Sequence, residues 1–337
     1  MNRIFIVTGS AGFVGNNVVR QLLDKGERVR ALYHDKRLDF KALGYDGADI
    51  EYFQGDVRDV KSLAPVFENP QGAELYVVHA AAVVTIMDTR KTKRALKEVN
   101  VGGTMNIVEC CLSCGVKRLV YVSSCHAIPE QDESPIPETE NFDPKAVHGA
   151  YAKSKAEAAR FVLDAVKTRR LNAVIVHPTG ITGPNDFSNT HMTHMANVFV
   201  KKGYPMLPRG GYNFVDVRDV AQGIITAADK GRTGECYLLC DEYYTVGQMM
   251  GYLAEICGKK APKKYAPTWL LKCIAPFAEI IYKLTKKTPL FTLYSIYTLN
   301  TNANYTHEKA TREFGYKPRG LKESLADTVA FIKANNL

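Results

Sequence analysis

Short apolar runs alternate with amphipathic stretches through the first half of this 337-residue chain. A strand that is buried on both faces reads as an unbroken apolar run, whereas a helix that packs on a sheet shows one apolar face. In the stretch Val14–Lys25, for example, apolar residues recur at the spacing of one helix face. The alternation therefore predicts a parallel sheet with helices on both faces. The predicted strands are Ile4–Val7, Val29–Leu32, Ile50–Phe53, Leu75–His79, Leu119–Val122 and Ala173–Val176.

A glycine-rich turn joins the first predicted strand to the first predicted helix, where residues 8–15 read Thr-Gly-Ser-Ala-Gly-Phe-Val-Gly. Glycines permit a sharp turn and the close approach of a pyrophosphate, and the helix N-terminus offers N–H groups to the anion. Because the motif lies between a strand and a helix, it predicts a dinucleotide-binding site. The residues expected to contact the dinucleotide here are Thr8, Gly9, Ala11, Gly12, Phe13, Val14 and Gly15.

The pattern becomes less regular after Gly183-Pro184, and from Tyr243 onward the chain reads as mostly helical. Between these points a strand followed by a helix (Phe214–Asp229) and a short strand (Cys236–Leu239) return to the earlier pattern. We therefore predict an α/β fold, a Rossmann-type doubly wound parallel sheet with a smaller, mostly helical C-terminal substrate lobe. Residues 1–180, with returning segments at about 214–240, would form the dinucleotide-binding domain. Residues 181–213 and 241–337 would form the substrate-binding lobe.

The spacing of Gly9, Gly12 and Gly15 resembles that of the extended short-chain dehydrogenase/reductase family, which includes NAD-dependent epimerases and dehydratases. Further segments that resemble motifs of this family are Asp56-Val57, His79–Ala82, Asn100–Thr104 and Phe214–Ala221. The resemblance implies that adenine lies near Asp56 and Val57 and that the backbone after His79 lines the cofactor. The remaining cofactor contacts that it implies are Ala80, Ala81, Ala82, Asn100, Tyr151, Lys155, Pro178, Thr179 and Ile181.

The end of the second predicted strand bears on the choice between NAD(H) and NADP(H). The acid that accepts bonds from the ribose in NAD-type members of the family would fall near Tyr33, which is not acidic. His34 and Arg37 follow it and would suit a 2′-phosphate. The sequence therefore favours NADP(H), with NAD(H) as the alternative.

Tyr151 and Lys155 stand four residues apart at the start of a helical segment, so their side chains share one helix face. At ~4 Å and an effective dielectric constant of ~20, the ammonium would favour the phenolate by about 4 kcal/mol. This interaction would lower the pKa of the phenol by at most about three units, toward the range of a general acid or base. By resemblance Ser124 completes the catalytic set, with Ser123 as the alternative serine.

The sequence segments that are expected to contact the substrate differ from those of the sugar-nucleotide branches of the family. Cys125-His126-Ala127 replaces the usual Val-Tyr-Gly, Gly180 stands where an Asn is common, and the Asp-Glu pair of dehydratases is absent. The chain is more similar to the dihydroflavonol reductase, cinnamoyl-CoA reductase and 3β-hydroxysteroid dehydrogenase branch, which implies a hydrophobic ketone or aldehyde and its alcohol. A sugar-nucleotide epimerase and a non-catalytic dinucleotide sensor are the alternatives. The substrate contacts expected are Met87, Cys125, His126, Phe187, His191 and Tyr212.

The net charge, the cysteines and the histidines indicate which partners, compartment and metals are to be expected. The net charge is 44 − 35 = +9 without a dense basic block, so we expect no nucleic acid. Eight cysteines lack framework spacing, which favours reduced thiols in a cytoplasmic protein without a signal peptide. His191 and His194 lack further ligands, so no metal is expected.

No apolar run reaches the ~18 residues of a membrane span. The apolar segment Trp269–Leu284 is expected to be a core-facing or lid helix, with a dimer contact and an interfacial membrane helix as alternatives. The resemblance implies a homodimer formed by the helices after Asn100 and around Tyr151.

Overall fold

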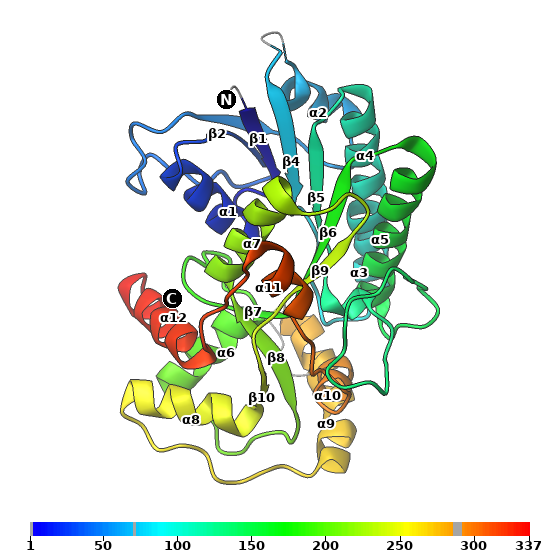
Figure 1. Cartoon of the computed structure of the whole chain (residues 1–337). Helices are drawn as coiled ribbons and strands as arrows, with labels where there is room; N and C mark the ends of the chain where they lie inside the picture. The colour runs from blue at the N-terminus through cyan, green and yellow to red at the C-terminus, as the bar shows by residue number, and fades with distance from the viewer. Residues whose placement is uncertain (1–2, 70–71, 286–291) are drawn as a thin grey trace.

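A seven-stranded parallel sheet forms the centre of the molecule in the computed structural model, which describes residues 3–69, 72–285 and 292–337 (Figure 1). The strand order is β3-β2-β1-β4-β5-β6-β9. From β1 the next strands along the chain extend the sheet to one side, and from β4 onward they extend it to the other, so the order reverses between β1 and β4. In sheets of this kind ligands bind where the order reverses, at the carboxyl ends of the strands. The predicted strands are confirmed, and their bounds are β1 (Arg3–Thr8), β2 (Arg28–Tyr33), β3 (Ile50–Gln54), β4 (Glu74–His79), β5 (Arg118–Val122), β6 (Ala173–Pro178) and β9 (Cys236–Leu239).

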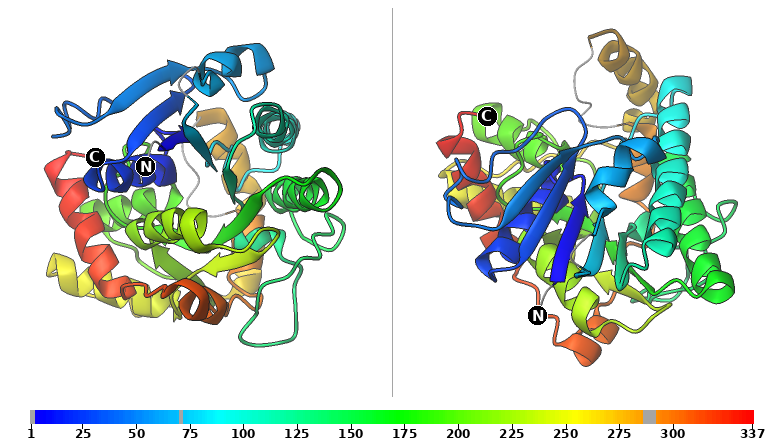
Figure 2. Two further views of the ribbon diagram at one scale, coloured as in Figure 1. Left: turned by 45° about the horizontal axis from the view of Figure 1, so that its top comes forward. Right: turned by 90° about the horizontal axis from the view of Figure 1, so that it is seen from above.

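Helices cover both faces of this sheet (Figure 2). Successive side chains of a strand point to opposite faces. Accordingly Ile4 and Ile6 of β1 belong to one hydrophobic core, whereas Phe5 and Val7 belong to the other. One face is packed by α1 (Phe13–Asp24) and α7 (Val217–Lys230), and the other by α2 (Val60–Phe67), α4 (Thr104–Ser113) and α5 (Ala150–Arg169). Before α4 the chain runs through α3 (Arg90–Ala95) and a π-helical segment, η1 (Leu96–Gly103).

A second lobe lies beyond the carboxyl ends of the large sheet, in the lower part of Figure 1. It contains a three-stranded sheet in the order β10-β8-β7, where β8 pairs in parallel with β7 and antiparallel with β10. The expected returning segment is thus divided, because β8 joins the small sheet while α7 and β9 pack with the large one. The strands are β7 (Gly180–Thr182), β8 (Gly211–Asp216) and β10 (Tyr243–Thr245). The remaining helices are α6 (His191–Lys202), α8 (Val246–Cys257), α9 (Thr268–Thr285), α10 (Leu293–Thr298), α11 (Glu308–Phe314) and α12 (Leu321–Ala334).

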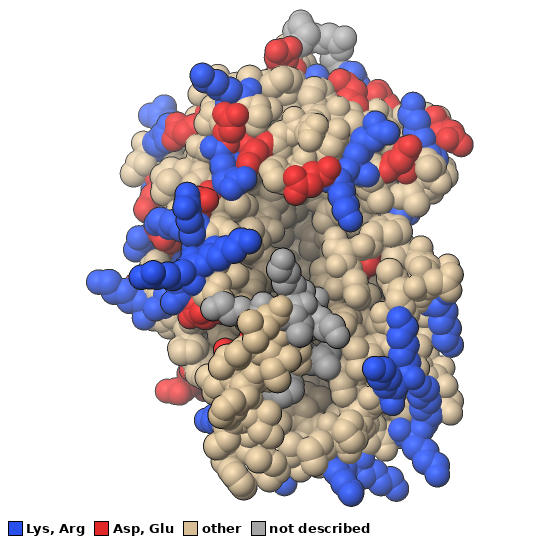
Figure 3. All heavy atoms as spheres, turned by 180° about the vertical axis from the view of Figure 1, so that it is seen from behind, with Lys and Arg blue, Asp and Glu red and all other residues tan. Residues whose placement is uncertain are grey.

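Acidic and basic side chains are mixed over the upper part of the rear face (Figure 3). None of the helices in the described part of the chain is long and apolar enough to cross a lipid bilayer.

Candidate active site

The glycine turn after β1 has no room for side chains. Gly9 has φ +66°, and a Cβ atom there would lie 2.8 Å from the Cα atom of Ala81. A Cβ atom on Gly15 would collide with the carbonyl oxygen of Gly9. The helix α1 starts after Gly12 without a side-chain cap, so its first N–H groups suit an anion such as a pyrophosphate. The residues present therefore fit a dinucleotide.

Thr8 joins the carboxyl ends of β1 and β4. Its Oγ1 atom accepts a hydrogen bond from the Ala81 N–H at 3.1 Å and lies 2.8 Å from Nδ1 of His79. The other ring nitrogen of His79 lies 3.1 Å from Oγ1 of Thr104. Burial lowers the pKa of His79 to about 3, so the ring is neutral. This chain of contacts places the backbone of residues 80–82 beside the glycine turn.

Asn100 links the segment after β4 to the helix that carries Tyr151. Its Oδ1 atom accepts from the Val83 N–H at 2.7 Å, and its Nδ2 group donates to the Val83 carbonyl and to Oγ of Ser154. Ser154 in turn donates to the carbonyl of Tyr151 at 2.7 Å. The amide of Asn100 is thus occupied by protein groups, and the residue orients its neighbours rather than offering its side chain to a ligand.

The three predicted catalytic residues come from two adjacent elements. Ser124 follows β5, while Tyr151 and Lys155 lie in the first turns of α5. A hydrogen bond joins the Ser124 and Tyr151 side chains. The Nζ group of Lys155 donates to the carbonyl of Val122 at 2.8 Å and lies 5.0 Å from the ring centroid of Tyr121. The helix of Tyr151 is therefore held against the strand that leads to Ser124.

The pKa of Tyr151 differs from the expectation drawn from its spacing to Lys155. Burial raises the pKa of Tyr151 to about 12, although the hydrogen bond with Ser124 acts in the opposite direction. Burial also lowers the pKa of Lys155 to about 7, because the charged ammonium is desolvated. The loss of hydration governs both groups, and Tyr151 is a protonated phenol at neutral pH.

His126 lies at the centre of an aromatic cluster beside Tyr151. Its Nε2 and Nδ1 atoms lie 3.0 Å from the hydroxyl of Tyr212 and 3.1 Å from that of Tyr294. The ring meets Tyr151 edge-on, with 6.0 Å between centroids. Burial lowers the pKa of His126 to about 4, so one ring nitrogen donates and the other accepts. The hydroxyl of Tyr212 also lies 3.1 Å from Sγ of Cys125. Three of the expected substrate contacts are thus brought together.

Tyr294 of α10 is a member of this cluster that sequence reasoning missed. Its ring occupies the space beside Gly149, where a Cβ atom would lie 2.5 Å from Cε2 of Tyr294. Gly149 has φ +89° and precedes α5. No local pattern in α10 marks Tyr294, because its partners are distant in the sequence.

Gly180 is the first residue of β7 and packs against the ring of Tyr212. A Cβ atom at this position would lie 2.9 Å from Cδ1 of Phe214 and 3.0 Å from Cδ1 of Tyr212. The space that a side chain such as Asn would need is therefore filled by aromatic rings.

The other expected substrate residues, Phe187, His191 and Met87, belong to three further segments. Phe187 packs edge-on against Phe331 of α12 at 5.2 Å and under Arg20 at 6.0 Å. His191 opens α6. Met87 lies in the segment before α3, where the adjacent Ile86 carbonyl accepts a hydrogen bond from Thr292 at 3.3 Å.

His177 is a second residue that sequence reasoning did not assign to the site. It is fully buried at the carboxyl end of β6, and its Nδ1 group donates to the carbonyl of Ser124 at 3.0 Å. Burial lowers the pKa of His177 to about 4. The position of β6 beside β5 was the available signal, because adjacent parallel strands end at the same edge.

Polar groups gather beyond the carboxyl end of β2. His34 lies 3.0 Å from Asp35 and 3.2 Å from Asp56. Arg58, which the sequence did not single out, pairs with Asp56 at 2.6 Å, and its hydrogen bonds lower the pKa of Asp56 to about 2. Arg37, by contrast, lies over the ring of Tyr52 at 4.9 Å. Arg58 is therefore the cation that pairs with Asp56, and the imidazole of His34 lies beside the same carboxylate.

The later cofactor candidates lie at the junction of the two sheets. Thr179 follows Pro178 and donates to Oδ1 of Asn213 at 2.9 Å, which joins the end of β6 to β8. Ile181 is half-buried in β7. Val57 lies apart from these residues, after β3, where its side chain is close to the backbone of Gly103. These contacts fix the backbone at the edge where the strands end.

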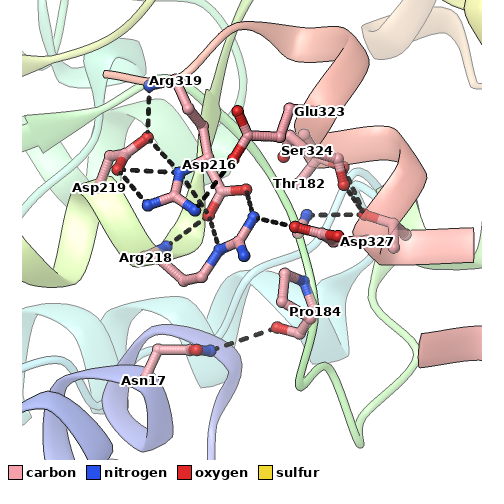
Figure 4. Close-up of polar contacts among 12 residues, drawn as sticks. Asn17, Thr182, Pro184, Asp216, Arg218, Asp219, Arg319, Glu323, Ser324 and Asp327 are labelled. Atoms are coloured by element: carbon pink, nitrogen blue, oxygen red, sulfur yellow. Dashed lines mark hydrogen bonds and ion pairs between the residues drawn. The ribbon is translucent and has the colours of Figure 1, made fainter. Parts of the chain in front are cut away.

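A charged network joins the C-terminal helix α12 to α7 and to the end of β8 (Figure 4). Asp216 caps α7 and is fully buried, and its carboxylate pairs with Arg218 at 2.8 Å. Arg218 also pairs with Asp327 of α12 at 2.7 Å, while Arg319 pairs with Asp219 at 3.0 Å. The segment Phe214–Ala221 thus connects the small sheet, α7 and α12.

A glycine turn of the dinucleotide-binding type and the Ser124, Tyr151 and Lys155 set thus lie at the carboxyl ends of the strands of a Rossmann-type sheet. A model of the NAD dependent epimerase/dehydratase family matches residues 5–240. The chain belongs to this family, within the extended short-chain dehydrogenases/reductases, and is an NAD(P)-dependent enzyme.

Relatives of different activity resemble the whole chain. It is 32% identical to sterol demethylase protein B of Methylococcus capsulatus, over 98% of this chain and 99% of that protein. It is 30% identical to UDP-glucose 4-epimerase of Vibrio cholerae, over 100% and 98%. The crystal structure of gox2253 superposes with a TM-score of 0.82 at 29% identity, covering 98% of both chains.

Proposed function

We propose that this enzyme interconverts a hydrophobic ketone or aldehyde and its alcohol by hydride transfer, with Tyr151 as the general acid or base. The observation that carries the proposal is the meeting of Ser124, Tyr151 and Lys155 at the carboxyl end of β5, on the same sheet edge as the glycine turn.

The chemistry divides between the cofactor and the chain. A bound nicotinamide would supply the hydride in reduction and take it up in oxidation. Ser124 donates a hydrogen bond to the substrate oxygen, and Tyr151 gives that oxygen its phenolic proton as negative charge develops. Lys155 binds the ribose hydroxyls and, while protonated, stabilises the phenolate that remains. A pKa of about 12 keeps Tyr151 in the donating form at neutral pH.

Aromatic side chains support a hydrophobic substrate. Tyr212 and Phe214 fill the space beside Gly180, and the neutral ring of His126 offers no charge to a diphosphate. The name of the relative from Methylococcus capsulatus, sterol demethylase protein B, points to the same class of compound. The epimerase relative keeps a sugar nucleotide as the second candidate substrate.

We further propose NADP(H) as the preferred cofactor. Tyr33 ends β2 without a carboxylate, and His34 and Arg58 stand close to where the adenosine ribose would lie. NAD(H) remains the alternative cofactor.

The domain division, the assembly and the location of the enzyme are proposed from the sequence. We propose residues 1–180 with 214–240 as the dinucleotide-binding part, and a homodimer through η1, α4 and α5. The eight cysteines are all free, which suits the cytoplasm. Light scattering that gives a monomer mass would refute the dimer.

The decisive experiment is a turnover screen. Purified protein with NADPH or NADH is assayed for cofactor oxidation against aromatic aldehydes, flavanonols, ketosteroids and simple ketones. We expect turnover with at least one cyclic ketone or aldehyde and faster turnover with NADPH. Tight binding of a UDP-sugar without net cofactor oxidation would instead assign an epimerase.

A further inference from the structure

The backbone of Ser124 is bonded to a histidine of the neighbouring strand. His177 lies in β6, which pairs in parallel with β5 (Figure 1), and its side chain is fully buried. Its Nδ1 atom lies 3.0 Å from the carbonyl oxygen of Ser124. Burial lowers the pKa of the ring to about 4, so the imidazole is neutral. Because a carbonyl oxygen can only accept a hydrogen bond, the single ring proton is on Nδ1 and is donated to Ser124.

The second ring nitrogen of His177 has no hydrogen-bond partner in the part of the chain that the structure describes. Nε2 is shielded from solvent, and it is a bare acceptor once Nδ1 carries the proton. The ring of Phe142 packs against the imidazole with 5.2 Å between centroids. A buried acceptor without a partner lowers the stability of the fold, whereas a leucine of similar size would fill this space without that cost. Stability alone therefore does not account for a histidine at this position.

The place of the Ser124 hydroxyl depends on the peptide that His177 holds. Ser124 is extended and precedes the short 3-10 helix η2 (Cys125–Ala127). Its carbonyl accepts a second hydrogen bond from the Ala127 N–H at 3.0 Å, and its Oγ atom accepts one from the His126 N–H at 3.3 Å. A rotation of the peptide after Ser124 would break the bond to His177 and carry the His126 N–H away from Oγ. The bond to His177 thus fixes the backbone from which the hydroxyl projects.

We propose that His177 is a positioning residue, whose Nδ1–H group holds the carbonyl of Ser124 and so keeps the Ser124 hydroxyl in place to donate to the substrate oxygen. This role rests on the proposed function, in which Ser124 and Tyr151 bind the same oxygen. The chain at the end of β5 is then held at two points, at Val122 by Lys155 and at Ser124 by His177. Such restraint matters, because a displacement of about 1 Å in a site can lower the rate by about 10²-fold.

Two substitutions separate the hydrogen bond of His177 from its bulk. His177→Leu keeps most of the volume and removes the donor, together with the unpaired Nε2 atom. His177→Asn keeps a donor, because the amide nitrogen of Asn is attached to Cγ as Nδ1 is in histidine, but it loses bulk. We expect His177→Leu to lower kcat by about ten- to hundredfold, with little change in KM, in the Kd for NADPH or in the midpoint of urea unfolding. His177→Asn should lower the urea midpoint, because the lost ring leaves a cavity, and should keep kcat within about threefold of the unaltered protein.

Ser324→Ala is the matched control, because Oγ of Ser324 is also a buried polar atom without a partner among the described residues and belongs to α12. It should leave kcat unchanged. Kinetics use whichever ketone or aldehyde of the turnover screen the unaltered protein reduces. Near-normal kcat for His177→Leu overturns the role of His177 and leaves the proposed function standing. Parallel losses of kcat and urea midpoint in both histidine variants also overturn it, since they indicate a purely structural role. Absence of turnover by the unaltered protein with every compound overturns the proposed function, and the role of His177 falls with it.

Discussion

Lys155 donates a hydrogen bond to the backbone carbonyl of Val122, 2.8 Å away, at the last residue of β5. The bond ties the helix of Tyr151 to the strand that leads to Ser124. It also directs the ammonium to a neutral carbonyl within a buried site, so the charge of Lys155 is costly there and its pKa falls to about 7. Lys155 therefore positions the site as well as acting within it.

Tyr151→Phe removes the proposed proton donor while keeping the ring. We expect kcat to fall by about 10²–10⁴ and the Kd for NADPH to change by less than about twofold. Tyr316→Phe is the control, because this hydroxyl is also buried and has no hydrogen-bond partner among the residues that the structure describes. Steady-state kinetics and fluorescence titration measure the two quantities. Near-normal turnover by Tyr151→Phe would remove the proposed mechanism.

The pH dependence tests the high pKa of Tyr151. Alcohol oxidation needs the phenolate, which is the minor form below a pKa of about 12. We expect kcat/KM for oxidation to rise about tenfold per pH unit between about pH 5 and 7 and to level off above about pH 7, where Lys155 loses the proton with which it stabilises the phenolate. Protonation of Tyr151 does not limit reduction. An oxidation rate that is constant between about pH 5 and 7 would show that the pKa of Tyr151 already lies below that range.

Gly180→Asn tests whether the rings beside β7 exclude a side chain. Its Cβ atom would lie within 3.0 Å of Tyr212 and Phe214, so we expect a loss of about 1–3 kcal/mol of unfolding free energy and a higher KM. Gly47→Asn is the control, because nothing lies within 4 Å of a Cβ atom there. Urea unfolding and kinetics provide the measurements. Unchanged stability would mean that Tyr212 moves freely.

Tyr33→Asp tests the cofactor choice. A carboxylate at the end of β2 would repel a 2′-phosphate and accept bonds from ribose hydroxyls. We expect the Kd for NADPH to rise by about tenfold or more and the Kd for NADH to fall. Lys25→Gln, which changes the net charge equally at the far end of α1, should leave both constants unaltered. Tighter binding of NADH by the starting protein would contradict the NADP(H) proposal.

Arg218→Ala tests the network that holds α12. The substitution leaves the buried carboxylate of Asp216 with the backbone N–H of residue 218 and with Arg319, 4.0 Å away, as its remaining cation, and should cost about 3 kcal/mol of unfolding free energy. Arg312→Ala removes an exposed pair and should cost less than about 1 kcal/mol. Urea unfolding compares the two variants. Equal small losses would show that Arg319 alone satisfies Asp216.

The sequence predicted the large sheet well, because strands buried on both faces are unbroken apolar runs and the glycine turn has a strict local geometry. It also indicated Tyr151 and Lys155 by their spacing within one helix, and Ser124 by the resemblance to the family. It did not indicate Tyr294 or His177, which reach the site through contacts between segments far apart in the chain. The prediction that Lys155 lowers the pKa of Tyr151 was wrong in direction. The pKa is raised by burial, which depends on all the residues packed around the phenol and cannot be inferred from a four-residue spacing.

The hydrogen bond between His126 and Tyr294 joins two parts of the site that are 168 residues apart in the chain. The glycine turn and the Ser124, Tyr151 and Lys155 set lie in the first half of the chain, whereas Tyr294, which contacts His126, lies near the C-terminus. A substitution of Tyr294 can therefore alter the wall that contacts His126 and leave the glycine turn, Ser124, Tyr151 and Lys155 unchanged in sequence.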